Sequence, residues 1–220
     1  KPIGGVERIS VFLGGIDASG ATMLALNALT KARLDGPDID VIASRQNPSF
    51  EEIAEWCEVR EAANLIPNAS DMASLLARAD LAIGGGGVTM WERCCLGIPS
   101  VIVTIAENQH SGTRAIAREG AALVAGDASE LDEEGLASIL GPIVRSKDER
   151  HRLRTRSSAL VDGKGRSRLI RAMTSFRVTL REAVRQDCNA IWQWRNAMET
   201  RRYSVDPNPI DLPTHRKWFE

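Results

Sequence analysis

Over the first 160 residues, short continuous apolar runs alternate with longer stretches in which apolar residues recur every three or four positions. The short runs are typical of buried β-strands, and they span residues 8–13, 40–43, 63–66, 81–83, 100–104 and 121–124. The longer stretches predict helices, one between Gly20 and Gly36 and others at residues 50–63, 71–79, 89–96, 109–118, 132–144 and 148–160. Strands that alternate with helices and are apolar throughout form parallel sheets covered on both faces. The pattern therefore predicts an α/β fold, a Rossmann-like doubly wound parallel sheet over residues 8–175.

The pattern changes near Phe176. Residues 177–183 alternate between polar and apolar positions, as in a half-exposed strand, and Asp187 is placed to cap a helix that contains Trp192 and Trp194. A stretch of about 45 residues is too short to bury a core of its own. We therefore expect residues 176–220 to be the truncated start of a second, α+β unit, and residues 1–7 to be a linker from an upstream domain.

Composition and charge exclude several classes of protein. The chain is 43% hydrophobic and 26% charged with a net charge of −1, which is ordinary for a globular protein. No stretch approaches the roughly 20 apolar residues that span a bilayer, and no signal peptide is present, so we expect a cytoplasmic protein without a membrane partner. Residues 145–185 hold thirteen basic residues against four acids. Sparse aromatic residues among them favour a solvated helix surface over a phosphate or nucleic-acid patch.

The four cysteines, Cys57, Cys94, Cys95 and Cys188, include no CxxC pair. Zinc sites need thiolates that converge on one point, and this spacing does not provide them. We expect reduced, mostly buried thiols and no metal.

The segment from Ala79 to Glu92 carries the clearest chemical signal. A buried strand runs into Gly84-Gly85-Gly86-Gly87 and then directly into a helix. Glycines let a ligand approach the backbone, and the free amides at a helix start attract anions, so this turn suits a diphosphate. The segment lacks the GxGxxG spacing and distant acid of a dinucleotide site, and it lacks the lysine of a P-loop. NAD and ATP are therefore disfavoured.

Polar residues near this turn admit two interpretations each. Glu92, three residues after Thr89, fits either a capping-box partner or an acceptor for the two ribose hydroxyls. Glu107-Asn108-Gln109 follows the next strand at the same sheet edge. These side chains suit hydroxyl and acetamido groups, unless Asn108 is only a polar N-cap. Gly14-Gly15-Ile16-Asp17 adds a third glycine turn to that edge.

Other residues have less specific roles at this stage. We expect His110 to pack or cap, His151 and His215 to face solvent, and Trp91 to pack its helix onto the sheet. The sequence contains no recognisable Ser/His/Asp arrangement and no paired carboxylates with hydrolytic spacing.

These motifs together resemble one family. The glycine turn with Thr89 and Glu92, the run Cys94-Cys95-Leu96-Gly97-Ile98-Pro99, and Glu107-Asn108-Gln109 are similar to the UDP-sugar hydrolase of pseudaminic acid biosynthesis and its spore-coat polysaccharide relatives. These enzymes are grouped with the peptidoglycan N-acetylglucosaminyltransferase in the glycosyltransferase-B fold. The resemblance covers residues 8–172, from the Gly14-Gly15-x-Asp17 turn to Gly163-Lys164-Gly165.

The resemblance implies a UDP-sugar site without metal or cofactor. Uracil is expected near Leu65 and Ile66, ribose on Glu92, and the sugar near Asn108 and Gln109. The diphosphate is expected at Gly86, Gly87, Val88 and Thr89, beside the rim that Gly15 joins. Val88 stands where many relatives have serine, so a hydroxyl contact to phosphate is not expected there.

The resemblance also implies that catalysis needs more than this chain. The family's catalytic histidine lies in a glycine-rich loop of an N-terminal domain, and no segment here matches that loop. We therefore expect this chain to bind UDP weakly and to hydrolyse nothing alone, with the missing N-terminal domain as its partner. A glycosyltransferase of the same fold and a non-catalytic nucleotide-sugar-binding module stay open as alternatives.

Residues 177–220 resemble the start of a GNAT-type acetyltransferase, through the predicted strand, the Asp187-capped helix and His215-x-x-Trp218-Phe219. The acetyl-CoA pyrophosphate turn of that family is absent, so acetyl-CoA is expected only for a complete domain. The resemblance implies a parent protein that fuses a hydrolase to an amino-sugar N-acetyltransferase.

Overall fold

The computed structural model describes residues 4–34, 36–175, 179–204 and 206–219. The chain divides into two compact units, residues 1–164 and residues 165–220. The domain boundary expected at 175/176 stays a prediction.

The first unit is built on a parallel sheet with the strand order β3-β2-β1-β4-β5-β6. The six strands are β1 (Arg8–Phe12), β2 (Asp38–Ala43), β3 (Ala63–Pro67), β4 (Leu81–Gly85), β5 (Ser100–Thr104) and β6 (Leu123–Asp127). The strand order reverses direction between β1 and β4, which is where open parallel sheets bind their ligands. The predicted doubly wound α/β fold is confirmed.

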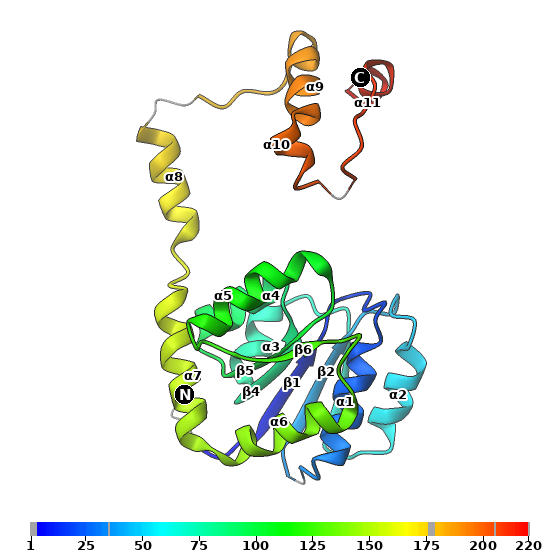
Figure 1. The fold of residues 1–220 in the computed structure, drawn as a ribbon, viewed down its shortest axis with the longest axis vertical. Helices are drawn as coiled ribbons and strands as arrows, with labels where there is room; N and C mark the ends of the chain where they lie inside the picture. Colours follow the sequence, from blue (N-terminus) through cyan, green and yellow to red (C-terminus); the bar gives the residue numbers. More distant parts are fainter. Residues whose placement is uncertain (1–3, 35, 176–178, 205, 220) are drawn as a thin grey trace. The chain divides into compact units, whose positions relative to one another are not determined.

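Helices cover both faces of this sheet (Figure 1). One layer consists of α1 (Ala21–Lys31), α2 (Phe50–Glu58) and α6 (Glu133–Arg145). The other contains α3 (Met72–Arg78), α4 (Val88–Leu96) and α5 (His110–Arg118), and α7 (Lys147–Leu160) packs against α4.

Alternation along the strands separates the core into its two layers. Ile9 and Val11 of β1 are fully buried and belong to the main cluster with α1, α2 and α6. Ile102 of β5 joins Met90 and Ile116 in a second cluster on the other face. Successive side chains of a strand point to opposite faces, so both faces of a covered sheet must be apolar.

Several element boundaries differ from those predicted, by the largest margin at the end of α2. β6 begins at Leu123 rather than Ala121, because the Ala121 amide donates to the Ile116 carbonyl and still belongs to the turn after α5. Helix α2 ends at Glu58 rather than residue 63, and the Arg60 guanidinium lies 3.8 Å from the Trp56 ring centroid beyond its end.

The second unit is helical in its described residues. It contains α8 (Gly165–Ser175), which the sequence pattern does not anticipate, a 3₁₀ turn (Arg185–Asp187), α9 (Cys188–Asn196), α10 (Met198–Arg201) and α11 (Leu212–Phe219).

The strand predicted at residues 177–183 is wrong for its described part. Arg177 and Val178 lie outside the described residues, and residues 179–184 form no strand, because no neighbouring strand pairs with them. The Asp187 carboxylate accepts from the Val184 amide (2.8 Å) and pairs with Arg181, instead of capping α9 by its side chain.

The predicted exposure of His215 is also wrong. Its ring is buried and its Nε2 lies 3.0 Å from the Cys188 carbonyl oxygen, because α11 packs against α9. His151 is exposed, as predicted.

The thiols are mostly buried, as predicted: Cys57, Cys94 and Cys188 are buried and Cys95 is exposed. Burial raises the pKa of the Cys57 and Cys94 thiols to about 11, so both are neutral near pH 7. Within the described residues, no helix has the length and apolar character needed to cross a membrane.

Ile53 tests the packing of α2 on the sheet. Its side chain is fully buried, so Ile53→Ala should lower the free energy of unfolding by about 2–5 kcal/mol through lost burial and a residual cavity. The matched control is Val59→Ala, six residues later, where the side chain is 77% exposed and the change should stay within about 0.5 kcal/mol. Urea denaturation of both variants measures the difference, and equal effects would contradict the packing described.

Candidate functional site

The carboxyl ends of the six parallel strands lie at one edge of the sheet, and the predicted site residues lie at strand ends, in the loops that follow them and in the first turns of α4. β4 passes through Gly86 and Gly87 into α4, which begins at Val88 rather than at Thr89 as predicted. Gly87 occupies the N-cap position, and no side chain caps the helix. The first amides of α4 have no carbonyl within the helix to bond, so they are oriented to bind an anion.

Two glycines of the turn make room for protein rather than ligand. A Cβ on Gly84 would lie 2.7 Å from Cζ of Arg93. A Cβ on Gly86 would lie 3.3 Å from Cβ of Gln109 and would collide with the Thr113 methyl group. Gly87 is less restricted, since its nearest neighbour would be Gln109 Nε2 at 3.7 Å.

Gln109 ties the glycine turn to the end of β5. Its Oε1 accepts from the Gly86 amide (3.0 Å) and from the Ile105 amide (3.2 Å). The Gly86 amide is therefore already bonded within the protein, and the predicted diphosphate contact at Gly86 cannot use this amide. Sequence reasoning assigned Gln109 to the sugar and did not anticipate this bridge.

Glu92 and Val88 lie four residues apart on the exposed face of α4, and Val88 is 76% exposed. The capping-box interpretation of Glu92 is wrong, because Thr89 lies inside the helix and its Oγ1 accepts from Arg93 Nη1 (3.3 Å). The ribose interpretation of Glu92 stays a prediction.

Residues Glu107–Gln109 form a 3₁₀ turn that leads into α5. Glu107 and Asn108 are exposed, and neither this turn nor α5 has a side-chain cap. The N-cap interpretation of Asn108 is therefore wrong, and its amide group is open to solvent at the sheet edge.

The turn after β1 differs from the turn after β4. The buried Asp17 carboxylate accepts from the amides of Ala21 (3.1 Å) and Thr22 (2.7 Å) at the start of α1. An anion is thus already in place at α1, whereas α4 has none. Gly15 lies in open space on this rim.

His110 stands beside two carboxylates. Its Nε2 is 3.3 Å from Asp127 Oδ2 at the end of β6 and 3.6 Å from Glu107 Oε2. Hydrogen bonds from the Ser129 amide and hydroxyl, with a smaller contribution from His110, lower the pKa of Asp127. The histidine thus packs between acidic groups at the outer end of the edge.

Trp91 does not pack onto the sheet as predicted. It is 39% exposed and lies beside α5, where a Cβ on Gly112 would be 3.8 Å from its ring. Met90, which is buried, takes the sheet-facing position instead.

Leu65 and Ile66 lie at the end of the edge strand β3. Ile66, Asn68, Ser70 and Arg78 help to line a pocket of about 390 Å³ in the loop that follows. Helix α3, which follows this loop, packs against α4, while β2 and β1 lie between β3 and β4 in the sheet.

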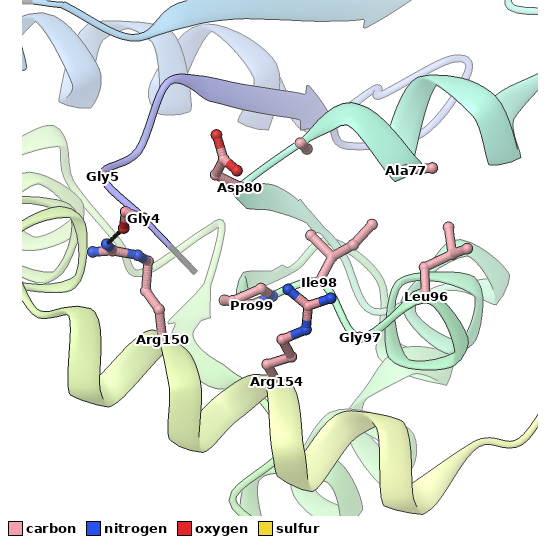
Figure 2. A pocket seen from close by; sticks show the side chains of 11 residues that line it. Gly4, Gly5, Ala77, Asp80, Leu96, Gly97, Ile98, Pro99, Arg150 and Arg154 are labelled. Carbon is pink, nitrogen blue, oxygen red and sulfur yellow. Dashed lines mark hydrogen bonds between the residues drawn. The ribbon is translucent and has the colours of Figure 1, made fainter. Parts of the chain in front are cut away.

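A second cavity, of about 230 Å³, lies at the opposite edge of the sheet (Figure 2). Its lining residues Asp80 and Pro99 precede β4 and β5, and Arg150 of α7 donates to the Gly4 carbonyl at 2.7 Å. This cavity lies between α7 and the segment before β1, away from the loops of the carboxyl edge.

Sequence reasoning missed Arg93. The side chain is 1% exposed, and its Nη2 donates to the Gly85 carbonyl at 2.8 Å. Burial lowers its pKa to about 10, so the guanidinium stays charged near pH 7. The available signal was its spacing, because Arg93 shares the buried face of α4 with Met90 and Cys94.

Gly86 tests the packing of the turn. Gly86→Ala should lower the free energy of unfolding by about 1–3 kcal/mol, because the new methyl meets Thr113 and Gln109. Gly87→Ala, one residue later, is the matched control and should cost less than 1 kcal/mol. Thr113→Ser, which removes only the obstructing methyl, should restore part of the loss in Gly86→Ala. Thermal unfolding of the variants measures this, and additive effects of G86A and T113S would contradict the contact.

Comparison with known proteins places this arrangement in a family. Residues 8–168 match the model of the glycosyltransferase family 28 C-terminal domain. The chain is 30% identical over 164 residues to the spore coat polysaccharide biosynthesis protein SpsG of Bacillus subtilis (strain 168), covering 72% of this chain and 47% of that protein.

A second relative is the UDP-N-acetylglucosamine–N-acetylmuramyl-(pentapeptide) pyrophosphoryl-undecaprenol N-acetylglucosamine transferase of Chromobacterium violaceum. It is 34% identical over 110 residues, which cover 46% of this chain and 30% of that protein. The chain thus spans half or less of the curated relatives it matches.

The fold is shared with solved glycosyltransferases. The Acinetobacter baumannii MurG structure superposes with a TM-score of 0.65 at 18% identity, covering 77% of this chain and 50% of that chain. The first unit has the Rossmann-like C-terminal fold of glycosyltransferase-B enzymes. Residues 8–168 therefore belong to the glycosyltransferase family 28 C-terminal domain family.

Proposed function

We propose that this chain is the nucleotide-binding half of a cytoplasmic UDP-sugar hydrolase. The parent enzyme would release UDP from a 2,4-diacetamido-2,4,6-trideoxy sugar in surface polysaccharide or pseudaminic acid biosynthesis. The observation that carries the proposal is the uncapped start of α4 on the glycine turn, with the exposed Glu92 on the same helix and Asn108 in the adjacent loop.

Each part of the ligand has a place in this proposal. The diphosphate accepts from the amides of Gly87, Val88 and Thr89, and Glu92 accepts from the ribose hydroxyls. Uracil lies by Leu65 and Ile66, beside the pocket after β3. The sugar reaches Asn108 and the Nε2 group of Gln109, whose Oε1 is already bonded to the protein backbone.

The reaction would be an inverting hydrolysis. A water oxygen forms the new bond to the anomeric carbon, its proton passes to a general base, and the bond to the β-phosphate oxygen breaks. The electron pair of that bond leaves with UDP, where the helix-start amides stabilise the added charge. The base is expected in a preceding domain of the parent, so this chain should bind UDP without turnover.

Transfer to an acceptor is the second candidate, favoured by the relatives whose names describe N-acetylglucosamine transferases. The same diphosphate and ribose contacts would serve it, and only the second nucleophile would differ. Release of UDP from the sugar by the longer parent protein without any acceptor would favour hydrolysis.

For the second unit we propose the beginning of an N-acetyltransferase domain. Its support is the sequence motif together with the packing of α11 on α9, in which Trp192 Nε1 donates to the Ile210 carbonyl (2.7 Å). The strand expected to precede α9 is absent from the described residues, which counts against the proposal.

Calorimetric titration of this chain with UDP, TDP and GDP tests the nucleotide site. We expect UDP to bind most tightly, and Glu92→Ala to weaken UDP roughly tenfold or more, because a hydrogen bond to a charged group contributes about 1.5–3 kcal/mol. Glu58→Ala, which removes an exposed carboxylate from α2, is the control and should leave the affinity unchanged. Absence of UDP binding, or binding that ignores Glu92, would refute the site.

A further inference from the structure

The glycine turn has a buried positive charge directly behind it. The guanidinium of Arg93 lies against Gly84, and no side chain larger than hydrogen fits between them. It donates to the Gly85 carbonyl (2.8 Å) and to the hydroxyl of Thr89 (3.3 Å), so it contacts both the end of β4 and the first turn of α4.

This charge has no counter-ion among the described residues. No carboxylate there forms an ion pair with Arg93, and its buried Nε has no hydrogen-bond partner. The neighbouring Cys94 thiol is neutral, since its pKa is raised to about 11. Glu92, the adjacent residue, is exposed on the helix surface and forms no ion pair with Arg93; its charge raises the pKa of Arg93, but burial has the larger effect and lowers it.

An unpaired buried cation is costly, and an apolar side chain of similar volume is often at least as stabilising. The two hydrogen bonds to Gly85 and Thr89 require donors but no net charge. The positive charge of Arg93 is therefore not explained by the stability of the fold. A diphosphate at the start of α4 would supply the missing negative charge. Thr89 would link the two groups, because its hydroxyl accepts from Arg93 and its backbone amide would donate to the phosphate.

We propose that Arg93 is a positioning residue whose buried charge acts through the turn to favour a diphosphate over uncharged ligands at the start of α4. The inference rests on the proposed diphosphate site. Arg93 does not touch the ligand: it holds Gly85 and Thr89 in place and adds a field in a region that water does not screen. Its contribution is thus directed at the phosphates and not at the nucleoside.

A purely structural role makes a different prediction. If Arg93 only fills space and joins β4 to α4, its replacement should weaken the binding of every ligand of the turn by the same factor. If the charge of Arg93 contributes to binding, its replacement should weaken the binding of a ligand more strongly, the more negative charge that ligand carries.

The test compares UDP, inorganic pyrophosphate and uridine by NMR titration of wild type, Arg93→Lys, Arg93→Gln and Arg93→Met. We expect Arg93→Gln and Arg93→Met to weaken UDP and pyrophosphate at least tenfold and uridine less than twofold. Arg93→Lys, which keeps the charge, should recover most of the affinity. Arg114→Gln, an exposed arginine on α5, is the matched control and should change UDP binding less than twofold. Arg93→Gln removes the charge but keeps a polar N–H donor group, so it decides the outcome if Arg93→Met does not fold.

The possible results separate the two proposals. Equal loss for uridine and UDP, or no loss for any ligand, would overturn the role of the charge while leaving the UDP site intact. If wild type binds pyrophosphate but not UDP, and Arg93→Gln no longer binds pyrophosphate, the role of the Arg93 charge would be supported and the nucleotide assignment would be refuted. Binding of neither ligand by wild type would overturn both.

Discussion

Gly84 and Gly86, where β4 leads into α4, have no room for a side chain, and the packing at the carboxyl edge of the sheet depends on this constraint. The Arg93 guanidinium occupies the space beside Gly84, and Gln109 and Thr113 occupy the space beside Gly86. Because these side chains come from α4 and from the segment after β5, the turn joins three consecutive parts of the fold. A methyl group added at Gly84 or Gly86 would force at least one of them to move.

The same constraint makes α4 different from α1. Both helices begin at the same sheet edge after a glycine-containing turn. The Asp17 carboxylate fills the start of α1, while α4 begins at Gly87 with no cap and with a buried cation behind it. This difference is why we propose the anion site at α4 and not at α1, beside the point between β1 and β4 where the strand order reverses.

The first unit belongs to the glycosyltransferase family 28 C-terminal domain family. The chain spans about half the length of its spore coat relative, so the reaction of a longer parent protein is a proposal. A hydrolase and a transferase would use the same diphosphate and ribose contacts. Their difference lies in what faces the sugar from the other side of the crevice. In the proposed site, the exposed polar side chains of Glu107 and Asn108, which directly precede the Gln109 bridge, are the groups of this chain that would face the sugar.

The sequence by itself determined the parallel sheet, the helices between its strands and the position of the glycine turn. These features depend on local periodicity and on residues adjacent in the chain, such as the apolar run 81–83 followed by four glycines. Only the tertiary structure decided that Gln109 bonds the Gly86 amide, that Arg93 is buried, that the Asp17 carboxylate accepts from the first amides of α1, and that His215 of α11 is buried against α9. Each of these depends on which distant segments meet, and a residue's type does not specify its partner. From the sequence, Gln109 beside Asn108 is interpreted as a ligand-binding residue. The fold instead places the Gly86 backbone amide, 23 positions away, within hydrogen-bond distance of its side chain.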